Sequence, residues 1–532
     1  MGDIMTSTSV PVEAANAATP PDSITPDLLR RLREHLPPSD ESRSATAPFT
    51  GDTLPALPRT TAAGLADTVA AARAAQPEWA ARSVRERERV VLRFAAELLA
   101  HRDLLCDLMQ WETGKARVHA AVEAQGVVSV ARYYGYRAHH HLAERRARSV
   151  LPGVVTTRVG YRPKGVVGVI APWNYPLFLA VGDVIPALLA GNAVLSKADS
   201  QAPWTLLAAR ELAARAGVPQ DLWRIVAGPG SAIGPALIEA VDYLCFTGST
   251  ATGRDIARRC ADRLIGASLE LGGKNAMIVC ADADLTAAAR GAVQACFASA
   301  GQMCIGIERI YVHEKVFDRF VRELAERTRR MRLGAGYGWD VDMGSLTTAA
   351  QLDTTVAHIR DAVDRGAAVA AGGRARPDLG PYFHEPTVLT GVTAEMRVCA
   401  EETFGPVVSV YPVASEDEAI AAANTGEYGL SASVWTRDVA RGTELARRVV
   451  AGAVNVNDGY LAAIASVDAP MGGMRTSGLG RRHGREGIIR YTEPQTVAAQ
   501  RIPTPTPDTL RDTFFGGYAR AQRLLATLRP KP

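Results

Sequence analysis

The sequence predicts an α/β protein built on doubly wound, largely parallel sheets, and three features of the chain support this fold class. Short apolar runs bounded by Gly and Pro alternate with helical patterns through the middle of the chain. The 532 residues are too many for one hydrophobic core, so two or three domains are expected. Several polar or glycine-rich segments directly follow apolar runs, as they do at the carboxyl edge of such sheets.

The first part of the chain divides into an extension and a helical region. Residues 1–46 are rich in Ala, Thr, Ser and Pro and lack the basic and apolar stretches of a secretory signal, so we expect a disordered extension. Over residues 65–148 apolar residues recur at intervals of three and four, as at Val91, Phe94 and Leu98. This region is predicted to form amphipathic helices that pack on a larger core.

Two series of strands follow the helical region. In the first, helical patterns near residues 206–214 and 232–240 separate the apolar runs, which predicts a doubly wound sheet. Its strands are expected at residues 154–155, 166–170, 193–195, 223–226 and 243–246. The second series predicts another α/β domain, with strands at residues 309–312, 407–413, 433–435 and 453–456.

Charge, hydropathy and cysteine usage exclude several classes of protein. The formal net charge is only +4 and no basic run is interleaved with aromatic residues, so we expect no nucleic-acid partner. The apolar segment 177–195 contains Gly, Asp, Pro and Asn, which membrane-spanning helices rarely combine, so no membrane segment is predicted. The seven cysteines form no CxxC pair, which indicates reduced thiols in the cytoplasm rather than disulfides or a zinc site.

The run His139-His140-His141 is the other candidate for a metal site. Consecutive positions on a helix point in different directions, so the three rings cannot face one ion together. We therefore predict no metal site and interpret the run as a solvated helix face.

One cysteine is placed for covalent chemistry. Cys304 follows an Ala-rich helical pattern and lies between Gly301 and Gly306, so a ligand can approach it closely. A thiolate in such a position can act as a nucleophile. The alternative is a buried structural thiol, the usual state of a free cysteine, and this segment alone does not exclude it.

Two further segments carry groups that such a nucleophile needs. Glu270 stands between apolar neighbours just before a Gly-Gly pair, a setting that raises the pKa of a carboxyl and suits a general base. Asn174 lies between two prolines directly after an apolar run, and a rigidly held amide can donate to an oxyanion. The alternatives are a solvated glutamate at a strand end and an Asn that serves only a tight turn.

Other segments have the features of a dinucleotide site. Lys197 ends a predicted strand, can reach ribose hydroxyls or phosphate, and is one of only six lysines. The run from Phe246 to Gly253 follows a strand and opens a helix, so its backbone N–H groups can bind a pyrophosphate oxygen. The run does not match the standard GxGxxG pattern, and a glycine-rich connection is the alternative.

Together these segments resemble the aldehyde dehydrogenase superfamily. The resemblance covers about residues 50–500 and rests on the runs Pro-Trp-Asn-Tyr-Pro, Phe-Thr-Gly-Ser, Leu-Glu-Leu-Gly-Gly-Lys, Gly-Gln-Met-Cys and Glu-Glu-Thr-Phe-Gly-Pro, in that order. It implies that family's fold, with a Rossmann-like cofactor domain, an α/β catalytic domain and a small bridging β-element for oligomerisation.

The resemblance also implies domain boundaries. The dinucleotide-binding domain is expected at 47–149 and 164–272, the catalytic domain at 273–480, the bridging β-element at 150–163 with 490–502, and a tail at 503–532. Bridging strands of this kind usually complete a neighbour's sheet, so a homodimer or homotetramer is expected.

By the same resemblance, Cys304 would be the nucleophile and Glu270 the general base. Asn174, with the backbone N–H of Cys304, would form the oxyanion hole. Relatives that pass the acyl group to coenzyme A usually lack this glutamate, so hydrolysis to a carboxylic acid is expected instead.

The resemblance places a second set of residues at the cofactor, namely Trp173, Lys197, Ser200, Gly248, Ser249, Glu402 and Phe404. Lys197 would hold the adenine ribose and Ser249 the pyrophosphate, whereas Glu402 and Phe404 would hold the nicotinamide ribose and ring. NAD-preferring relatives commonly carry a glutamate where this chain has Ser200, and that charge would repel a 2′-phosphate. NADP is therefore the expected cofactor, with NAD also allowed.

The sequence constrains the identity of the aldehyde substrate less than that of the cofactor. The chain is most similar to actinobacterial NADP-dependent succinate-semialdehyde dehydrogenases of a second type, which implies succinate semialdehyde. Better known enzymes of that activity clamp the substrate carboxylate with two arginines, and the matching positions here are Ala298 and Gly182. Arg475 or Arg309 could substitute, although both could equally be ordinary ion-pairing residues.

Two other functions stay open. The uncharged positions Ala298 and Gly182 also fit a broad-specificity enzyme for aliphatic or aromatic aldehydes. A catalytically silent binding or structural protein, like the crystallins related to this family, would bind the dinucleotide without turnover.

Overall fold

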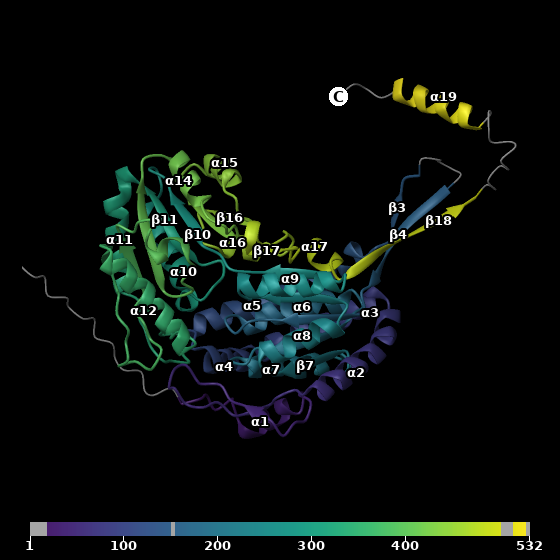
Figure 1. The fold of residues 1–532 in the computed structure, drawn as a ribbon, viewed down its shortest axis with the longest axis horizontal. Coiled ribbons are helices and arrows are strands. Elements are labelled where there is room, and N and C mark those ends of the chain that lie inside the picture. The colour runs from purple at the N-terminus through teal and green to yellow at the C-terminus, as the bar shows by residue number, and fades with distance from the viewer. Residues whose placement is uncertain (1–18, 150–154, 502–513, 528–532) are drawn as a thin grey trace, which may run out of the picture. The chain divides into compact units, whose positions relative to one another are not determined.

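The chain is described by a computed structural model over residues 19–149, 155–501 and 514–527. Contacts within the chain divide it into two units, Met1–His141 with Pro163–Glu493, and Leu142–Arg162 with Pro494–Pro532. The first unit contains a six-stranded and a seven-stranded sheet with their helices (Figure 1). This organisation confirms the predicted α/β fold class.

The six-stranded sheet has the strand order β17-β9-β8-β5-β6-β7. Its strands are β5 (Val166–Ile170), β6 (Ala193–Ala198), β7 (Trp223–Ala227), β8 (Tyr243–Thr247), β9 (Gly266–Glu270) and β17 (Gly478–Leu479). All neighbours pair in parallel except β17, which runs antiparallel to β9. The first five strands follow a doubly wound order, whose switch point lies between β5 and β8.

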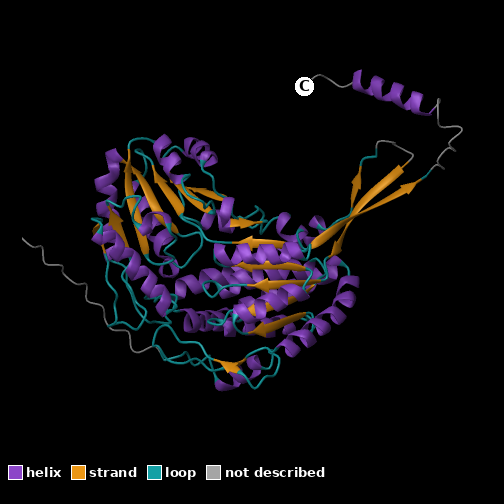
Figure 2. Ribbon diagram, viewed as in Figure 1, coloured by secondary structure: helices purple, strands orange, loops and turns teal. Residues whose placement is uncertain are grey.

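Two groups of helices pack on this sheet, as Figure 2 shows in purple. One group comprises α6 (Pro176–Leu189) and α7 (Pro203–Arg215), covered in turn by α3 (Val84–Ala100), α4 (Arg102–Thr113) and α5 (Arg117–His141). The other group comprises α2 (Ala62–Ala81), α8 (Gly230–Ala240) and α9 (Thr250–Asp262). The predicted amphipathic helices over residues 65–148 are confirmed as far as His141.

The seven-stranded sheet has the order β12-β13-β14-β11-β10-β15-β16. Its strands are β10 (Asn275–Val279), β11 (Ile307–His313), β12 (Ala368–Ala371), β13 (Thr387–Thr390), β14 (Val407–Val413), β15 (Ser431–Trp435) and β16 (Ala453–Val456). Only the β12–β13 pair is antiparallel. One core lies between this sheet and α10 (Leu285–Phe297) with α11 (Phe317–Arg329), and a second lies under α14 (Glu416–Ala423) and α15 (Val439–Arg448).

Shorter elements connect and flank the two sheets. These are the helix α12 (Ala349–Asp364) and the helical turns α13 (Arg397–Ala400), α16 (Leu461–Ala465), α17 (Glu486–Ile489), η1 (Ala298–Gly301), η2 (Glu314–Val316) and η3 (Arg475–Ser477). A two-stranded sheet, β1 (Ser42–Arg43) with β2 (Leu57–Pro58), lies near the amino terminus.

The predicted strands at 166–170, 193–195, 223–226 and 243–246 are confirmed, as are those at 309–312, 407–413, 433–435 and 453–456. The strands β9 and β10 were not predicted. β9 begins with Gly, Ala and Ser, and β10 begins with Asn275 after Lys274, so each strand has only a short apolar run to mark it. β12 consists only of Ala and Val and does not stand out from its helical surroundings.

Part of the expected amino-terminal disorder is wrong. The helix α1 (Pro26–Arg33) begins at Thr25, whose hydroxyl accepts the N–H of Leu28 at 3.1 Å. Leu28 and Leu32 are buried, because α1 packs on α7. The Ala, Thr and Pro composition concealed this short amphipathic helix, while residues 1–18 lie outside the described residues.

The second unit contains a three-stranded sheet in the order β18-β4-β3 and one helix. These elements are β3 (Arg145–Ala147), β4 (Val155–Pro163), β18 (Thr492–Gln500) and α19 (Phe514–Thr527). β4 and β18 fall within the predicted bridging element, of which residues 150–154 and 502 lie outside the described residues, as do 503–513 and 528–532 of the predicted tail. In the described ranges no helix is long and apolar enough to cross a membrane.

A buried ion cluster joins the carboxyl-terminal part of the first unit to the six-stranded sheet. The Asp183 carboxylate on α6 accepts two hydrogen bonds from Arg482, at 2.8 and 3.1 Å, and one from Arg490 at 2.5 Å. Arg482 also donates to the hydroxyl of Thr247 at 2.5 Å. All three charged side chains are at least nine-tenths buried, so each charge depends on its partners.

We expect Asp183→Asn to destabilise the protein by about 3–5 kcal/mol, because it leaves two buried arginines without a counter-charge. Urea or thermal unfolding measures the change. Asp255→Asn is the matched control, since Asp255 pairs with Arg259 on an exposed turn of α9 and should cost less than about 1 kcal/mol. Equal stability of the two variants would contradict the assigned role of the cluster.

Candidate active site

Cys304 lies in the connection between α10 and β11. From residue 295 to residue 312 it is the one residue that is not buried. The preceding turn is tightly wound, with Ser299 and Ala300 in the left-handed region at φ of 51° and 56°. A Cβ at Gly301 would lie 2.1 Å from the carbonyl oxygen of Gly405, so only glycine fits there. The connection therefore presents one thiol from an otherwise closed segment.

The Cys304 thiol is strongly biased toward its protonated form. Burial is the largest cause, and the charges of Glu270 and Glu402 add to it, so that the pKa rises to about 12. The two carboxyl groups must therefore lie near the sulfur. The sequence placed all three residues at one site, and the structure brings them together.

Asn174 lies directly before α6 and is fixed from both ends. Its side-chain Nδ2 donates to the carbonyl of Gln302 at 2.9 Å, and its own carbonyl accepts from the Lys115 ammonium at 2.7 Å. Lys115 is paired with buried Glu123 at 2.5 Å, and Glu123 also accepts the first free N–H groups of α6. The amide thus keeps one N–H beside the cysteine segment for a further acceptor.

Glu270 ends β9 and is 4% exposed. Its Oε1 atom is buried without a hydrogen-bond partner, and burial raises the pKa of the carboxyl to about 7. The positive charges of Arg482 and Arg490 oppose this rise. Because Thr247 pairs with Glu270 across the sheet and binds Arg482, the ion cluster lies next to this carboxyl. These properties suit a general base near neutral pH.

The predicted cofactor residues follow the carboxyl ends of neighbouring strands. Trp173 comes after β5, Lys197 lies in β6 with Ser200 after it, and Gly248 with Ser249 comes after β8. Parallel strands bring these ends to one edge of the six-stranded sheet, on both sides of its switch point.

Lys197 lies near the end of β6, and Ser200 lies in the turn that follows. Lys197 is 5% exposed, and burial lowers the pKa of its ammonium. The Ser200 hydroxyl donates to the carbonyl of Gly228 at 3.3 Å. Asp199 accepts the N–H of Gln201 at 2.8 Å, so its carboxylate takes part in the turn itself.

Gly248 and Ser249 form the start of α9. The Ser249 hydroxyl accepts the N–H of Thr252 at 3.3 Å and so caps the helix. A Cβ at position 248 would lie 2.5 Å from the ring of Phe246, so any residue with a side chain would clash with that ring. The N–H groups that open α9 have no acceptor within the helix and can receive an anion.

Glu402 and Phe404 lie in an irregular segment before β14. Glu402 accepts the N–H of Gly273 at 3.0 Å, and burial followed by the charge of Glu308 raises the pKa of Glu402 to about 8. The ring of Phe404 meets the ring of Trp173 edge to face at 5.8 Å. This contact joins the predicted nicotinamide side of the site to the end of β5.

Sequence reasoning missed the residues that hold these groups in place. Lys115 and Lys274 are 2% and 4% exposed, and both form ion pairs of 2.5 Å with buried glutamates. With Lys197, three of the six lysines of the chain are buried around the site. The scarcity of lysine was the signal that could have indicated them. In a chain that carries mostly arginine at its surface, the few lysines are more often needed for a specific contact.

Of the two suggested carboxylate clamps, Arg309 is wrong, whereas Arg475 stays a prediction. Arg309 is buried and donates to the carbonyl of Lys274 at 2.6 and 2.9 Å. Arg475 donates to the carbonyls of Asn424 and Gly426 at 2.8 and 2.9 Å. Both guanidinium groups therefore hold backbone segments together.

The histidine run at the end of α5 was interpreted as a solvated helix face, and this is correct only for His140. His140 is exposed, but His139 contacts the Glu88 carboxylate at 2.7 Å and His141 contacts the hydroxyl of Tyr133 at 2.9 Å. In the parts of the chain that the structure covers, no three His, Cys, Asp or Glu side chains are grouped to hold a metal ion.

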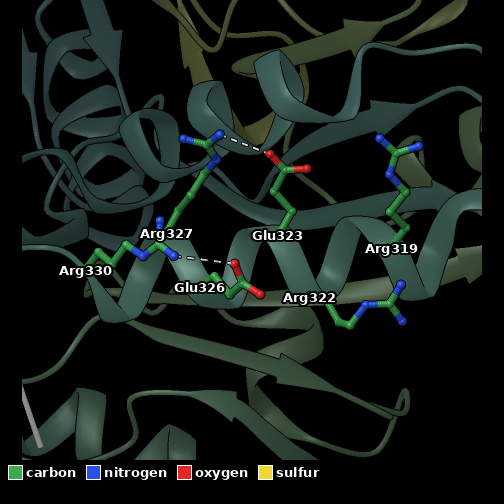
Figure 3. A pocket seen from close by; sticks show the side chains of 6 residues that line it. All are labelled: Arg319, Arg322, Glu323, Glu326, Arg327 and Arg330. Atoms are coloured by element: carbon green, nitrogen blue, oxygen red, sulfur yellow. Dashed lines mark hydrogen bonds and ion pairs between the residues drawn. The ribbon is translucent and has the colours of Figure 1, made fainter.

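A surface concavity lies apart from the predicted site residues, none of which lines it. Figure 3 shows the side chains that line it, all from α11 or its carboxyl end, namely Arg319, Arg322, Glu323, Glu326, Arg327 and Arg330. Its two ion pairs, Arg327–Glu323 and Arg330–Glu326, join residues one helical turn apart.

Comparison with known proteins gives one family across most of the chain. A model of the aldehyde dehydrogenase family matches residues 36–497. A protein of Mycolicibacterium smegmatis, provisionally named succinate-semialdehyde dehydrogenase (NADP+), is 54% identical over 87% of this chain and 89% of its own length. A 3-sulfolactaldehyde dehydrogenase of Pseudomonas putida is 37% identical over 86% of this chain and 94% of its own. A solved NADP-dependent enzyme of E. coli has a TM-score of 0.83 and 34% identity over 86% of this chain and 95% of that chain.

We expect Glu270→Gln to make Cys304 react faster with iodoacetamide in alkaline solution. The Glu270 carboxylate is charged above its pKa of about 7 and then raises the pKa of the thiol. Removing that charge increases the thiolate fraction, so alkylation should be severalfold faster at about pH 8.5 and unchanged at about pH 5.5. Mass spectrometry identifies the labelled residue, with half-buried Cys399 as internal control. Slower labelling of the variant would show that the carboxylate instead removes the thiol proton.

Proposed function

Because this chain belongs to the aldehyde dehydrogenase family, we propose that it oxidises an aldehyde to a carboxylic acid through a thioester on Cys304. One observation carries the proposal. Cys304 is the accessible residue of a buried segment, beside an Asn174 amide with an N–H to spare and a Glu270 carboxyl with a pKa of about 7.

The first step is attack of the Cys304 sulfur on the aldehyde carbon, with loss of the thiol proton to water. The carbonyl oxygen becomes an oxyanion, which the Asn174 amide and the backbone N–H of Cys304 stabilise by hydrogen bonds. Removing one such donor typically costs about 10²–10³ in rate. Lys115 fixes the Asn174 backbone, so the donor is in place before the substrate arrives.

The second step is hydrolysis of the thioester. A bound oxidised nicotinamide dinucleotide would supply the hydride acceptor for thioester formation. Glu270 then removes a proton from water, which attacks the acyl carbon and releases the acid while Cys304 recovers its proton. The pKa of about 7 leaves Glu270 largely ionised under mildly alkaline conditions and still basic enough to act.

The residues of the predicted cofactor site fit a dinucleotide. The N–H groups at the start of α9 that Ser249 does not cap would be donors for a pyrophosphate. Lys197 and Ser200 would face the adenine ribose, and Glu402 with Phe404 the nicotinamide ribose and ring. We propose NADP as the preferred cofactor, because Ser200 is uncharged and the Asp199 carboxylate is engaged by the N–H of Gln201.

We propose succinate semialdehyde as the substrate. The relative of Mycolicibacterium smegmatis that is provisionally named for this reaction supports it, and the sulfonated substrate named for the Pseudomonas putida relative is a second anionic aldehyde. Arg309 does not supply the carboxylate site, because its guanidinium is buried and bound to backbone carbonyls. Two polar groups near the cysteine segment are the Tyr175 hydroxyl, which contacts Ser299 at 3.0 Å, and His119, whose Nδ1 accepts the Ser299 N–H at 3.2 Å.

A broad-specificity aldehyde dehydrogenase is the second candidate. A Cβ built at Gly182 would meet no atom within 4 Å, so there is open space at the position where an arginine clamp would stand. Such space fits a larger uncharged aldehyde. A catalytically silent binding protein is a third possibility, and it predicts dinucleotide binding without turnover.

Two properties outside the site also belong to the proposal. The seven free cysteines support a reducing cytoplasm. The edge strand β18 is exposed from its second residue to its end and can pair with another copy, which supports a homodimer or homotetramer.

We expect the purified protein to oxidise succinate semialdehyde with NADP at least about tenfold more efficiently than hexanal or benzaldehyde, an energy difference of about 1.4 kcal/mol. Initial rates of NADPH absorbance, repeated with NAD, measure both preferences. Faster oxidation of the uncharged aldehydes would favour the broad-specificity enzyme and remove succinate semialdehyde from the proposal.

We expect Cys304→Ala to abolish turnover while NADP still quenches the intrinsic tryptophan fluorescence. Glu270→Gln should release about one NADPH per site in a burst and then deacylate slowly, because the thioester forms but its hydrolysis lacks a base. Stopped-flow absorbance separates the two phases. Full steady-state activity of Cys304→Ala would rule out the mechanism.

A further inference from the structure

Glu308 is a buried carboxylate that neither catalytic step uses. It lies in β11, four residues after Cys304, and is 6% exposed. A charge buried to this extent needs partners that offset the loss of water. The identity of those partners suggests what Glu308 does.

Both oxygens of the Glu308 carboxylate are occupied. One oxygen binds the Lys274 ammonium at 2.5 Å and accepts the N–H of Thr403 at 2.9 Å. The other accepts the N–H of Phe404 at 3.0 Å. One side chain therefore joins three segments, namely the strand after the nucleophile, the turn after Glu270, and the segment that carries Glu402 and Phe404.

The segment 402–406 has no helix or strand to define its conformation. Phe404 is in the left-handed region at φ of 51°, which is unfavourable for a residue with a side chain. Thr403 is fully buried, and its hydroxyl and carbonyl bind His358 at 3.0 Å and Gln351 at 2.8 Å. Its N–H, with that of Phe404, points at Glu308. The segment keeps its shape through side chains from elsewhere in the chain.

We propose that Glu308 is a positioning residue for the cofactor side of the site. Its carboxylate holds Glu402 and Phe404 in the orientation in which they receive the nicotinamide ribose and ring. The Lys274 ammonium, 2.5 Å away, is the ion-pair partner of this buried carboxylate. This inference rests on the proposed dehydrogenase function and adds to it a residue that touches neither substrate nor cofactor.

The test compares Glu308→Gln, Glu308→Asp and the double variant Lys274→Met/Glu308→Gln with the full-length wild-type protein. Glu308→Gln keeps the size of the side chain but removes the charge, and it leaves Lys274 unpaired. The double variant also removes the unpaired ammonium, so it tests the loss of the carboxylate with less loss of stability. Glu308→Asp keeps the carboxylate but shortens the side chain by one methylene, so the carboxylate lies farther from its partners.

Three measurements are made on each variant. NADP titration of tryptophan fluorescence gives Kd without turnover, and Trp173, in contact with Phe404, lies where it can report on this segment. Steady-state kinetics separate kcat from KM. Thermal unfolding shows whether the variant is folded at the assay temperature.

Glu326→Gln is the matched control. The substitution is the same and Glu326 also pairs with a basic residue, Arg330, but the pair lies on the exposed face of α11 at 3.8 Å (Figure 3). It should leave Kd, kcat and melting temperature unchanged.

We expect Glu308→Gln and the double variant to bind NADP about tenfold more weakly, as the loss of a charge-assisted hydrogen bond would cause. Their kcat/KM for NADP should fall by about 10²-fold, because the ring would no longer be aligned. Glu308→Asp should recover part of the loss. Wild-type Kd and kcat in the folded double variant would overturn the inference and leave the proposed function intact. Absence of NADP binding and turnover in the wild-type protein would overturn both.

Discussion

The buried ion pairs of Asp183 with Arg482 and Arg490 hold the end of the first unit against its six-stranded sheet. The chain completes five strands of the six-stranded sheet by residue 270, builds the whole seven-stranded sheet, and then returns to add β17. Arg482 and Arg490 bind Asp183 just after that return, so the ion cluster fixes the end of the chain's path. The same cluster borders Glu270, so the closure of the fold also brings two positive charges that oppose the rise in the pKa of this carboxyl on burial.

Much of the fold could be predicted because its strands carry a local signal. The strands β5 and β8 are almost entirely apolar, and β6 and β14 begin with apolar pairs or triplets, as is typical of parallel strands covered on both faces. β9 and β12 lack this signal, and their place in a sheet depends on neighbours far along the chain. The helix α1 was concealed by composition, since two buried leucines in a region of Ala, Thr and Pro suffice to dock it.

The residues of the candidate site also divide into those that the sequence could indicate and those that it could not. Cys304, Glu270 and Asn174 stand in short runs whose order along the chain is itself informative, so they could be named in advance. Their supports could not, because Lys115 lies 59 residues from the backbone oxygen it binds and Glu308 lies 95 residues from Thr403. The suggested role of Arg309 failed for a related reason, since only the packed structure shows that backbone carbonyls take up its guanidinium.

The antiparallel pairing of β17 with β9 also bears on how the protein is made. The partners Leu269 and Leu479 are about two hundred residues apart, and folding slows as such pairings become more distant in sequence. During synthesis the outer edge of β9 therefore stays without its partner until nearly the whole enzyme has left the ribosome. Unpaired strand edges promote aggregation. A chain interrupted before Gly478 would expose this edge and leave Asp183 buried without its arginines, so shortened products of translation should aggregate or be degraded instead of persisting as a stable fragment.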